Sequence, residues 1–130
     1  MLHLESKTVT VNKSAEELFD QLRDFKNFNQ LMPDSVQKFE ADDNSFMFQM
    51  KGLPEVRVMV DEEVKPDHIK LRSASSKLNF TMACHIEPQT DNTCQAHFVF
   101  DGDFNMMMRM MVEKPLKNFL ENLADKLTGI

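Results

Sequence analysis

Apolar and polar residues alternate through the middle of the chain, from residue 36 to residue 100. A period of two is typical of strands that bury one face, and turn residues such as Asp42-Asp43-Asn44 and Gly52-Leu53-Pro54 separate the alternating stretches. We therefore predict a meander of six strands. They are Val36–Glu40, Phe46–Met50, Val56–Val64, Ile69–Ser73, Leu78–Ile86 and Cys94–Phe100.

The alternation also predicts how these strands pair. Short antiparallel hairpins keep every inward apolar side chain on one face of the sheet. The predicted opposite pairs are Phe48 with Val58, Val60 with Leu71, Leu71 with Phe80, and Met82 with Phe98. Charged and polar residues fall on the other face, so we expect a sheet with one face in water.

The segment before the meander predicts one strand and two short helices. His3–Val11 is extended, and its apolar residues change parity, which a bulge near Ser6 or Lys7 would explain. Ser14 and Glu17 form a capping box that starts a helix. A second short helical turn ends before Pro33.

The last element is predicted as a long helix over Asn105–Leu127. An apolar stripe should place it on the sheet, and Pro115 should kink or briefly break it near Glu113 and Lys114. The stripe is Met108, Met111, Val112, Leu116, Phe119, Leu120, Leu123 and Leu127. Met106 and Met110 lie off it, where they suit ligand access, a lipid surface, a partner protein, or packing against a nearby loop.

Composition and charge narrow the class of protein. A chain of 130 residues suits one domain over residues 1–130, and its net charge of −6 argues against nucleic acid as the main partner. We see no secretory signal and no apolar run long enough for stable membrane insertion, and so expect a cytoplasmic protein. Cys84 and Cys94 are expected to be buried free thiols. The four histidines do not have the spacing of a zinc site, so no metal or other cofactor is predicted.

Three segments resemble the helix-grip (SRPBCC) superfamily, which contains the birch-pollen allergen, the steroidogenic (START) lipid-transfer domains, and bacterial polyketide cyclases and lipid-transport proteins. They are residues 6–19 (SKTVTVNKSAEELF), residues 24–33 with Asp24-Phe25-Lys26-Asn27-Phe28 and Leu31-Met32-Pro33, and residues 113–120 (EKPLKNFL). The resemblance implies an α+β fold, in which a curved seven-stranded antiparallel sheet wraps around the terminal helix. It also implies a cavity for an apolar small molecule.

The leading hypothesis is therefore non-catalytic binding or transport of a small hydrophobic molecule or lipid between the sheet and the terminal helix. Eleven Met and eleven Phe, with no Trp or Tyr, suit an adaptable apolar cavity. The open alternative is that bulky inward Phe side chains fill this space and leave a small pocket or none. The candidate ligand-binding residues are Phe48, Val58, Leu71, Phe80, Met82, Phe98, Met107, Met108 and Met111.

Two alternatives stay open, an enzyme resembling polyketide cyclases and a protein-interaction module resembling chaperone activators. Catalysis would need an ionisable group that reaches the pocket, and no residue is assigned a catalytic role. His85 and His97 are predicted on the wet face and Glu62 at the rim of the pocket. The polar candidates for the mouth are Asp34, Gln37, Ser73 and Arg109. The oligomeric state is not predicted.

Overall fold

The computed structural model describes residues 2–74 and 78–130. Its strands and helices follow the predicted order, with the first strand divided in two. The strands are β1 (Leu2–Glu5), β2 (Val9–Val11), β3 (Val36–Ala41), β4 (Ser45–Met50), β5 (Val56–Val64), β6 (His68–Ser73), β7 (Asn79–Thr90) and β8 (Thr93–Asp103). The helices are α1 (Ala15–Arg23), the 3-10 helix η1 (Phe25–Gln30) and α2 (Met106–Leu127).

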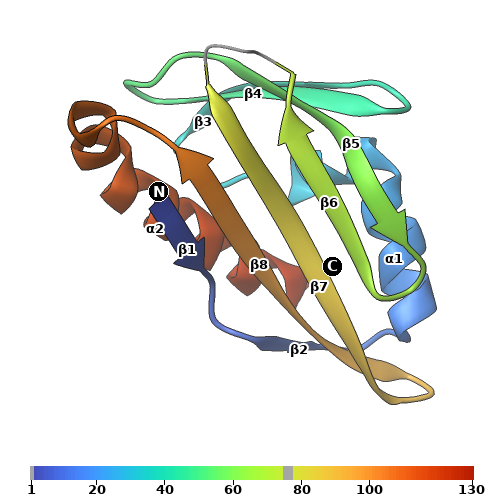
Figure 1. The fold of residues 1–130 in the computed structure, drawn as a ribbon. Helices are drawn as coiled ribbons and strands as arrows, with labels where there is room; N and C mark the ends of the chain where they lie inside the picture. The colour runs from blue at the N-terminus through green and yellow to red at the C-terminus, as the bar shows by residue number, and fades with distance from the viewer. Residues whose placement is uncertain (1, 75–77) are drawn as a thin grey trace.

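The strands form one antiparallel sheet in the order β1-β8-β7-β6-β5-β4-β3, with β2 also paired to β8. Figure 1 shows the sheet in front, with α1 and α2 behind it on the same face. The inward side chains of the sheet and the inner faces of the helices make one buried core. This is the predicted helix-grip arrangement of an α+β fold, with a curved antiparallel sheet and a C-terminal helix.

The predicted bulge in the first strand is confirmed at Ser6. Glu5 lies opposite Val99 and Val9 opposite Ala96, so three residues of the first strand face two of β8. The Ser6 N–H donates to the carbonyl of Phe98 at 2.9 Å, and the Phe98 N–H donates to Ser6 Oγ at 2.8 Å. These bonds satisfy the backbone groups that the interrupted ladder leaves without partners.

The predicted faces of the sheet are correct, but three of its four predicted pairs are wrong. Val60 faces Leu71 as predicted. Phe48 faces Val56, Leu71 faces Met82, and Met82 faces Phe100, each two residues from the prediction. A shift of two preserves the face, so hydrophobic alternation alone cannot detect it.

The β7–β8 hairpin shows the physical source of this error. The predicted strands leave residues 87–93 to the turn, whereas β7 continues to Thr90 and the chain reverses at Asp91-Asn92. Cys84 consequently faces Phe98 and Cys94 faces Pro88. Both thiols are free and buried, as predicted.

Glu62 differs from its predicted place because β5 carries a second irregularity. The register shifts between Val60 and Glu62, so that Glu62 lies opposite Lys70 and Glu63 opposite Ile69. Glu62 Oε1 lies 2.7 Å from Nε2 of His68, and both belong to the outer face. The bulge therefore removes Glu62 from the inner rim.

Helix α2 runs without a break from Met106 to Leu127 and has Pro115 inside it. The Asn105 side chain caps its start by accepting the Met108 N–H at 2.8 Å. Of the two predicted effects of Pro115, a kink or a short break, the break is therefore wrong. Pro115 cannot donate to the carbonyl of Met111, but both residues lie on the exposed side, where water can serve as the donor.

Candidate functional site

An apolar cavity lies between α2, from Met108 to Phe119, and the inner face of the sheet. Its walls come from β4, the turn after it, β5, β7, β8 and α2. The described residues that line it are Phe48, Met50, Leu53, Pro54, Val56, Leu78, Phe80, Met82, Phe100, Met108, Val112, Leu116 and Phe119. Every one of these side chains is apolar, so the wall offers a guest dispersion contacts and an escape from water.

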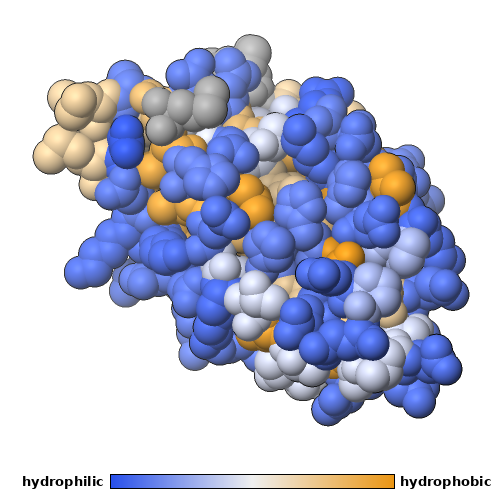
Figure 2. Space-filling model, turned by 60° about the horizontal axis from the view of Figure 1, so that its bottom comes forward, coloured by the Kyte–Doolittle hydropathy of each residue, from blue (hydrophilic) through white to orange (hydrophobic). Residues whose placement is uncertain are grey.

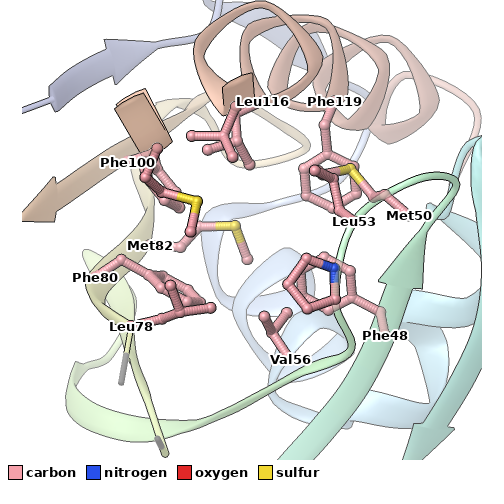
Figure 3. A pocket seen from close by; sticks show the side chains of 13 residues that line it. Phe48, Met50, Leu53, Val56, Leu78, Phe80, Met82, Phe100, Leu116 and Phe119 are labelled. Carbon is pink, nitrogen blue, oxygen red and sulfur yellow. The ribbon is translucent and has the colours of Figure 1, made fainter. Parts of the chain in front are cut away.

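Two stacked aromatic pairs frame the cavity. Phe48 stacks on Phe119 with ring centroids 5.2 Å apart and planes inclined by 5°, and Phe80 stacks on Phe100 at 5.2 Å and 21°. Figure 3 shows the two pairs on opposite sides, with Met82 reaching into the space between them. Each pair joins two different elements, so the walls are held in place by contacts that also stabilise the fold.

The cavity volume is about 60 Å³. A buried water needs roughly 10–15 Å³ of such space and two to four polar partners, and this lining offers little polar surface. The space therefore suits a compact apolar guest better than water. A larger guest requires side chains to move, and the three rotatable bonds of Met50, Met82 and Met108 allow such movement.

The structure places the predicted ligand-binding residues in three environments. Phe48, Phe80, Met82 and Met108 line the cavity. Val58, Leu71 and Phe98 are buried in the core outside this lining, and the last two border a separate void of about 10 Å³ beside α1. That void is too small for a ligand.

Met107 and Met111 lie outside the cavity, contrary to the expectation that they face it. Their side chains are 76% and 57% exposed. A helix turns 100° per residue, so Met108 and Val112 face the sheet together while Met107 and Met111 lie well away from that direction. Met111 was wrongly placed in the apolar stripe and Met107 wrongly named as a ligand-binding residue, because consecutive apolar residues obscure the helical period.

The prediction missed nine lining residues. Met50, Val56, Leu78 and Phe100 have the inward parity, and Val112, Leu116 and Phe119 belong to the predicted stripe of α2. The sequence pattern therefore identifies these residues as inward-facing candidates, but it does not distinguish them from other core residues. Leu53 and Pro54 lie in the turn after β4, where periodicity carries no information.

The polar candidates lie elsewhere. Arg109 pairs with Glu113 at 3.3 Å on α2, while Asp34 and Gln37 border a surface depression between η1 and β3. Ser73 borders a second depression with outward residues of β6, β7 and β8. None of these four belongs to the described lining of the apolar cavity.

A row of histidines crosses the outer face of the sheet. The ring of His85 lies 5.7 Å from that of His68 and 5.3 Å from that of His97. Partial desolvation lowers the pKa of His85, and charge on His97 and His68 lowers it further. The positions of His85 and His97 on the outer face agree with the prediction.

Within residues 2–74 and 78–130, no cluster of three His, Cys, Asp or Glu side chains is arranged to hold a metal ion.

The cysteines do not supply a reactive group to the cavity. Burial raises the pKa of the Cys84 thiol far above its usual range and also raises the pKa of Cys94. A thiol that stays protonated is a poor nucleophile. The cavity can therefore hold an apolar molecule, but its described lining has no group to transfer a proton or attack a bound guest.

Comparison with solved structures shows the same fold in proteins of different roles. A START superfamily protein from Mycobacterium smegmatis is 17% identical (TM-score 0.69; 98% of this chain and 94% of that chain covered). Norcoclaurine synthase from Thalictrum flavum is 13% identical (TM-score 0.69; 98% and 91%). The Aha1 protein from Colwellia psychrerythraea, solved as a dimer, is 12% identical (TM-score 0.64; 98% and 97%). At such low sequence identity, these structural similarities establish a shared fold and not a shared function.

No curated protein matches the sequence. Among the helices of the described residues, none combines the length and apolarity required to cross a bilayer.

Residues 4–128, nearly the whole chain, match the family described as polyketide cyclase / dehydrase and lipid transport. The protein is thus a member of that family, which supports a ligand-binding role, and it shares its fold with a START superfamily protein.

Proposed function

We propose that this protein binds a small hydrophobic molecule or the apolar part of a lipid, without covalent chemistry, in the cavity between the sheet and α2. The observation that supports this most is the uniform lining: every described side chain around the cavity is apolar. Affinity would come from apolar area removed from water, at roughly 25 cal/mol per Å².

The mobility of the wall determines the size of the guest. Met82 lies between the two stacked aromatic pairs, and Met108 lines the cavity from the first turn of α2. Rotation of these thioether side chains can enlarge the cavity without breaking Phe48–Phe119 or Phe80–Phe100 stacking. The proposal therefore favours compact or flexible apolar ligands over long rigid ones.

A cyclase-like reaction has less support. Proton transfer needs an acid or base within hydrogen-bond reach of the substrate. The described lining contains no ionisable side chain, and the histidine row occupies the opposite face of the sheet. Binding without turnover is thus the role that the site geometry supports best.

Cavity filling tests this proposal directly. Met108→Trp places a bulky indole in the cavity, whereas Met107→Trp places the same group on the exposed side one residue away. The natural chain has no Trp, so each variant also gains a single fluorescent reporter. We expect Met108→Trp to abolish uptake of the neutral apolar dye N-phenyl-1-naphthylamine, and Met107→Trp to retain it.

The thermal unfolding midpoint of each variant shows whether lost uptake reflects lost folding. Equal uptake by both variants would overturn the cavity as the binding site. Native mass spectrometry of protein purified from its own host, followed by organic extraction, addresses the natural ligand. A co-purifying apolar compound supports binding, and its chemical conversion by the protein would instead favour the enzyme.

A further inference from the structure

The first two turns of α2 carry four exposed methionines, Met106, Met107, Met110 and Met111, which we call the methionine face. Their side chains are 75%, 76%, 77% and 57% exposed. Figure 2 shows pale orange side chains protruding at the upper left, the side on which α2 begins in Figure 1. These residues lie outside the apolar cavity, so ligand binding there does not account for them.

Most of the exposed large apolar residues of this chain are methionines. Among the described residues, the large hydrophobic side chains that are exposed are Val64 and the four of the methionine face. Each described Leu and Phe is buried or half-buried. The feature that these four positions share, and that Val64 lacks, is the thioether, whose sulfur is polarizable as well as apolar.

Helical spacing brings these thioethers together. Residues three and four apart are neighbours on a helix surface, with Cβ atoms about 5–6 Å from each other. Met107 neighbours Met110 and Met111, and Met110 neighbours Met106 as well. Met107 and Met110 are therefore the centre of the group. The flexible side chains allow two or three sulfur atoms to converge on one ion.

Thioether sulfur is a soft, uncharged ligand that selects soft metals such as Cu(I) over Mg²⁺ or Ca²⁺. The neighbouring Arg109 has its charge offset by Glu113, at 3.3 Å. From this geometry we infer that the methionine face binds a soft monovalent cation, Cu(I) or Ag(I), with Met107 and Met110 as the central ligands and Met106 or Met111 completing the site.

The inferred site has a distinctive pH dependence. Binding by Cys or His requires a deprotonated ligand, so affinity falls as the pH falls. A thioether carries no proton to displace. Cation affinity at the methionine face should therefore stay nearly constant between pH 8 and pH 5, unlike binding at the two thiols or the histidine row.

Titration of the full chain with silver nitrate in chloride-free buffer tests the inference, with the methionine methyl groups labelled with ¹³C. We expect the Met106, Met107, Met110 and Met111 methyl signals to shift and to saturate at one equivalent. The double variant Met107→Leu/Met110→Leu keeps the apolar area and the helix propensity but removes the two central sulfurs. It should weaken binding at least about tenfold, because loss of even an outer-shell partner commonly costs 10–100-fold.

Met59→Leu is the matched control, because Met59 is a half-buried methionine on β5, away from α2. It should leave the titration unchanged. Unchanged binding by the double variant, shifts confined to residues near Cys84 and Cys94, or no saturable shift would each overturn the site. The methionine face lies outside the cavity, so failure of the silver titration leaves the apolar-ligand proposal intact.

Discussion

The two halves of α2 differ in how deeply their apolar side chains are buried, although they belong to one continuous helix. The second half, Leu116–Leu127, buries a closely spaced series of apolar side chains. The first half, Met106–Pro115, presents an exposed methionine face and buries Val112, and its Met108 and Val112 share the cavity wall with Leu116 and Phe119 at the start of the second half. One helix thus supplies both the closed core and the wall of the open space.

Polar contacts strengthen this division. In the second half, Glu121 accepts the Lys7 N–H at 2.8 Å, Asp125 pairs with the Lys7 ammonium group, and Lys117 donates to the carbonyl of Glu5. These contacts fasten the helix to the bulge between β1 and β2. In the first half, Arg109–Glu113 and the Asn105 cap are contacts within the helix or its cap.

Because its two halves differ in this way, α2 stabilises the fold and still borders a cavity. The second half supplies burial, which dominates folding stability. The first half is then free to place Met108 at the cavity, where its flexible side chain packs less uniquely than Leu but adapts to a guest. We expect perturbations of the two halves to differ accordingly.

The largest difference should appear when one residue of each half is truncated. Leu120 is fully buried, and Leu120→Ala should lower the free energy of unfolding by about 2–5 kcal/mol. Met110 is 77% exposed, and Met110→Ala should change it by less than about 0.5 kcal/mol. Urea denaturation measures both, and similar losses would contradict the division of the helix.

An intermediate effect is expected where β8 leads into α2. A Cβ added at Gly102 would lie 2.6 Å from Cε2 of Phe104 and 3.0 Å from Cε1 of Phe100. Gly102→Ala should therefore displace these rings and cost about 1–3 kcal/mol, as overpacking usually does. It should also alter dye uptake, because Phe100 lines the cavity.

Gly129→Ala is the matched control for that substitution. A Cβ there meets its nearest atom, the carbonyl oxygen of Lys126, at 3.9 Å. Stability and uptake should both stay near the values of the unsubstituted protein. If Gly102→Ala behaves like this control, the rings of Phe100 and Phe104 do not pack as closely against Gly102 as described here.

The smallest effect should come from pH and should not distinguish the two halves. Because the pKa of folded His85 is lowered, the unfolded chain binds more protons below about pH 6.5, and stability falls as the pH falls through this range. The pKa of His3 is raised by Asp101 and Glu5, which acts in the opposite direction. His85→Gln should therefore reduce the loss of thermal stability between pH 8 and pH 5.

The unfolding midpoint is measured at both pH values, with Leu120→Ala and Met110→Ala in the same buffers. The gap between these two variants should stay constant, since the histidine row lies on the opposite face of the sheet. A larger loss at low pH in His85→Gln than in the unsubstituted protein would contradict the predicted direction of the His85 effect.

Sequence predicted the architecture well because the relevant signals are local. Ser14 caps α1 by accepting the Glu17 N–H at 3.1 Å, as its capping box predicted. Inward parity identified the buried face of the sheet through Phe48, Leu71 and Phe98. Strand register was harder to predict. A shift of two residues preserves the buried face, and the register depends on where the turn forms.

The cavity was harder to predict than the core. Phe48 and Val58 share the inward face, yet Phe48 lines the cavity while Val58 is buried away from it. That distinction depends on where helix and sheet fail to meet, which is set by tertiary packing. The consecutive methionines of α2 posed a second problem, because their sequence does not indicate which of them face inward.

Methyl NMR under xenon pressure shows whether the space between α2 and the sheet admits a guest, because a dry apolar cavity takes up small apolar guests. Eleven methionines supply probes throughout the chain. Saturable shifts are predicted for Met50, Met82 and Met108, which line the cavity, with Met107 and Met111 unaffected. Shifts confined to the exposed methionines, or none that saturate, would contradict a guest-accessible cavity between α2 and the sheet.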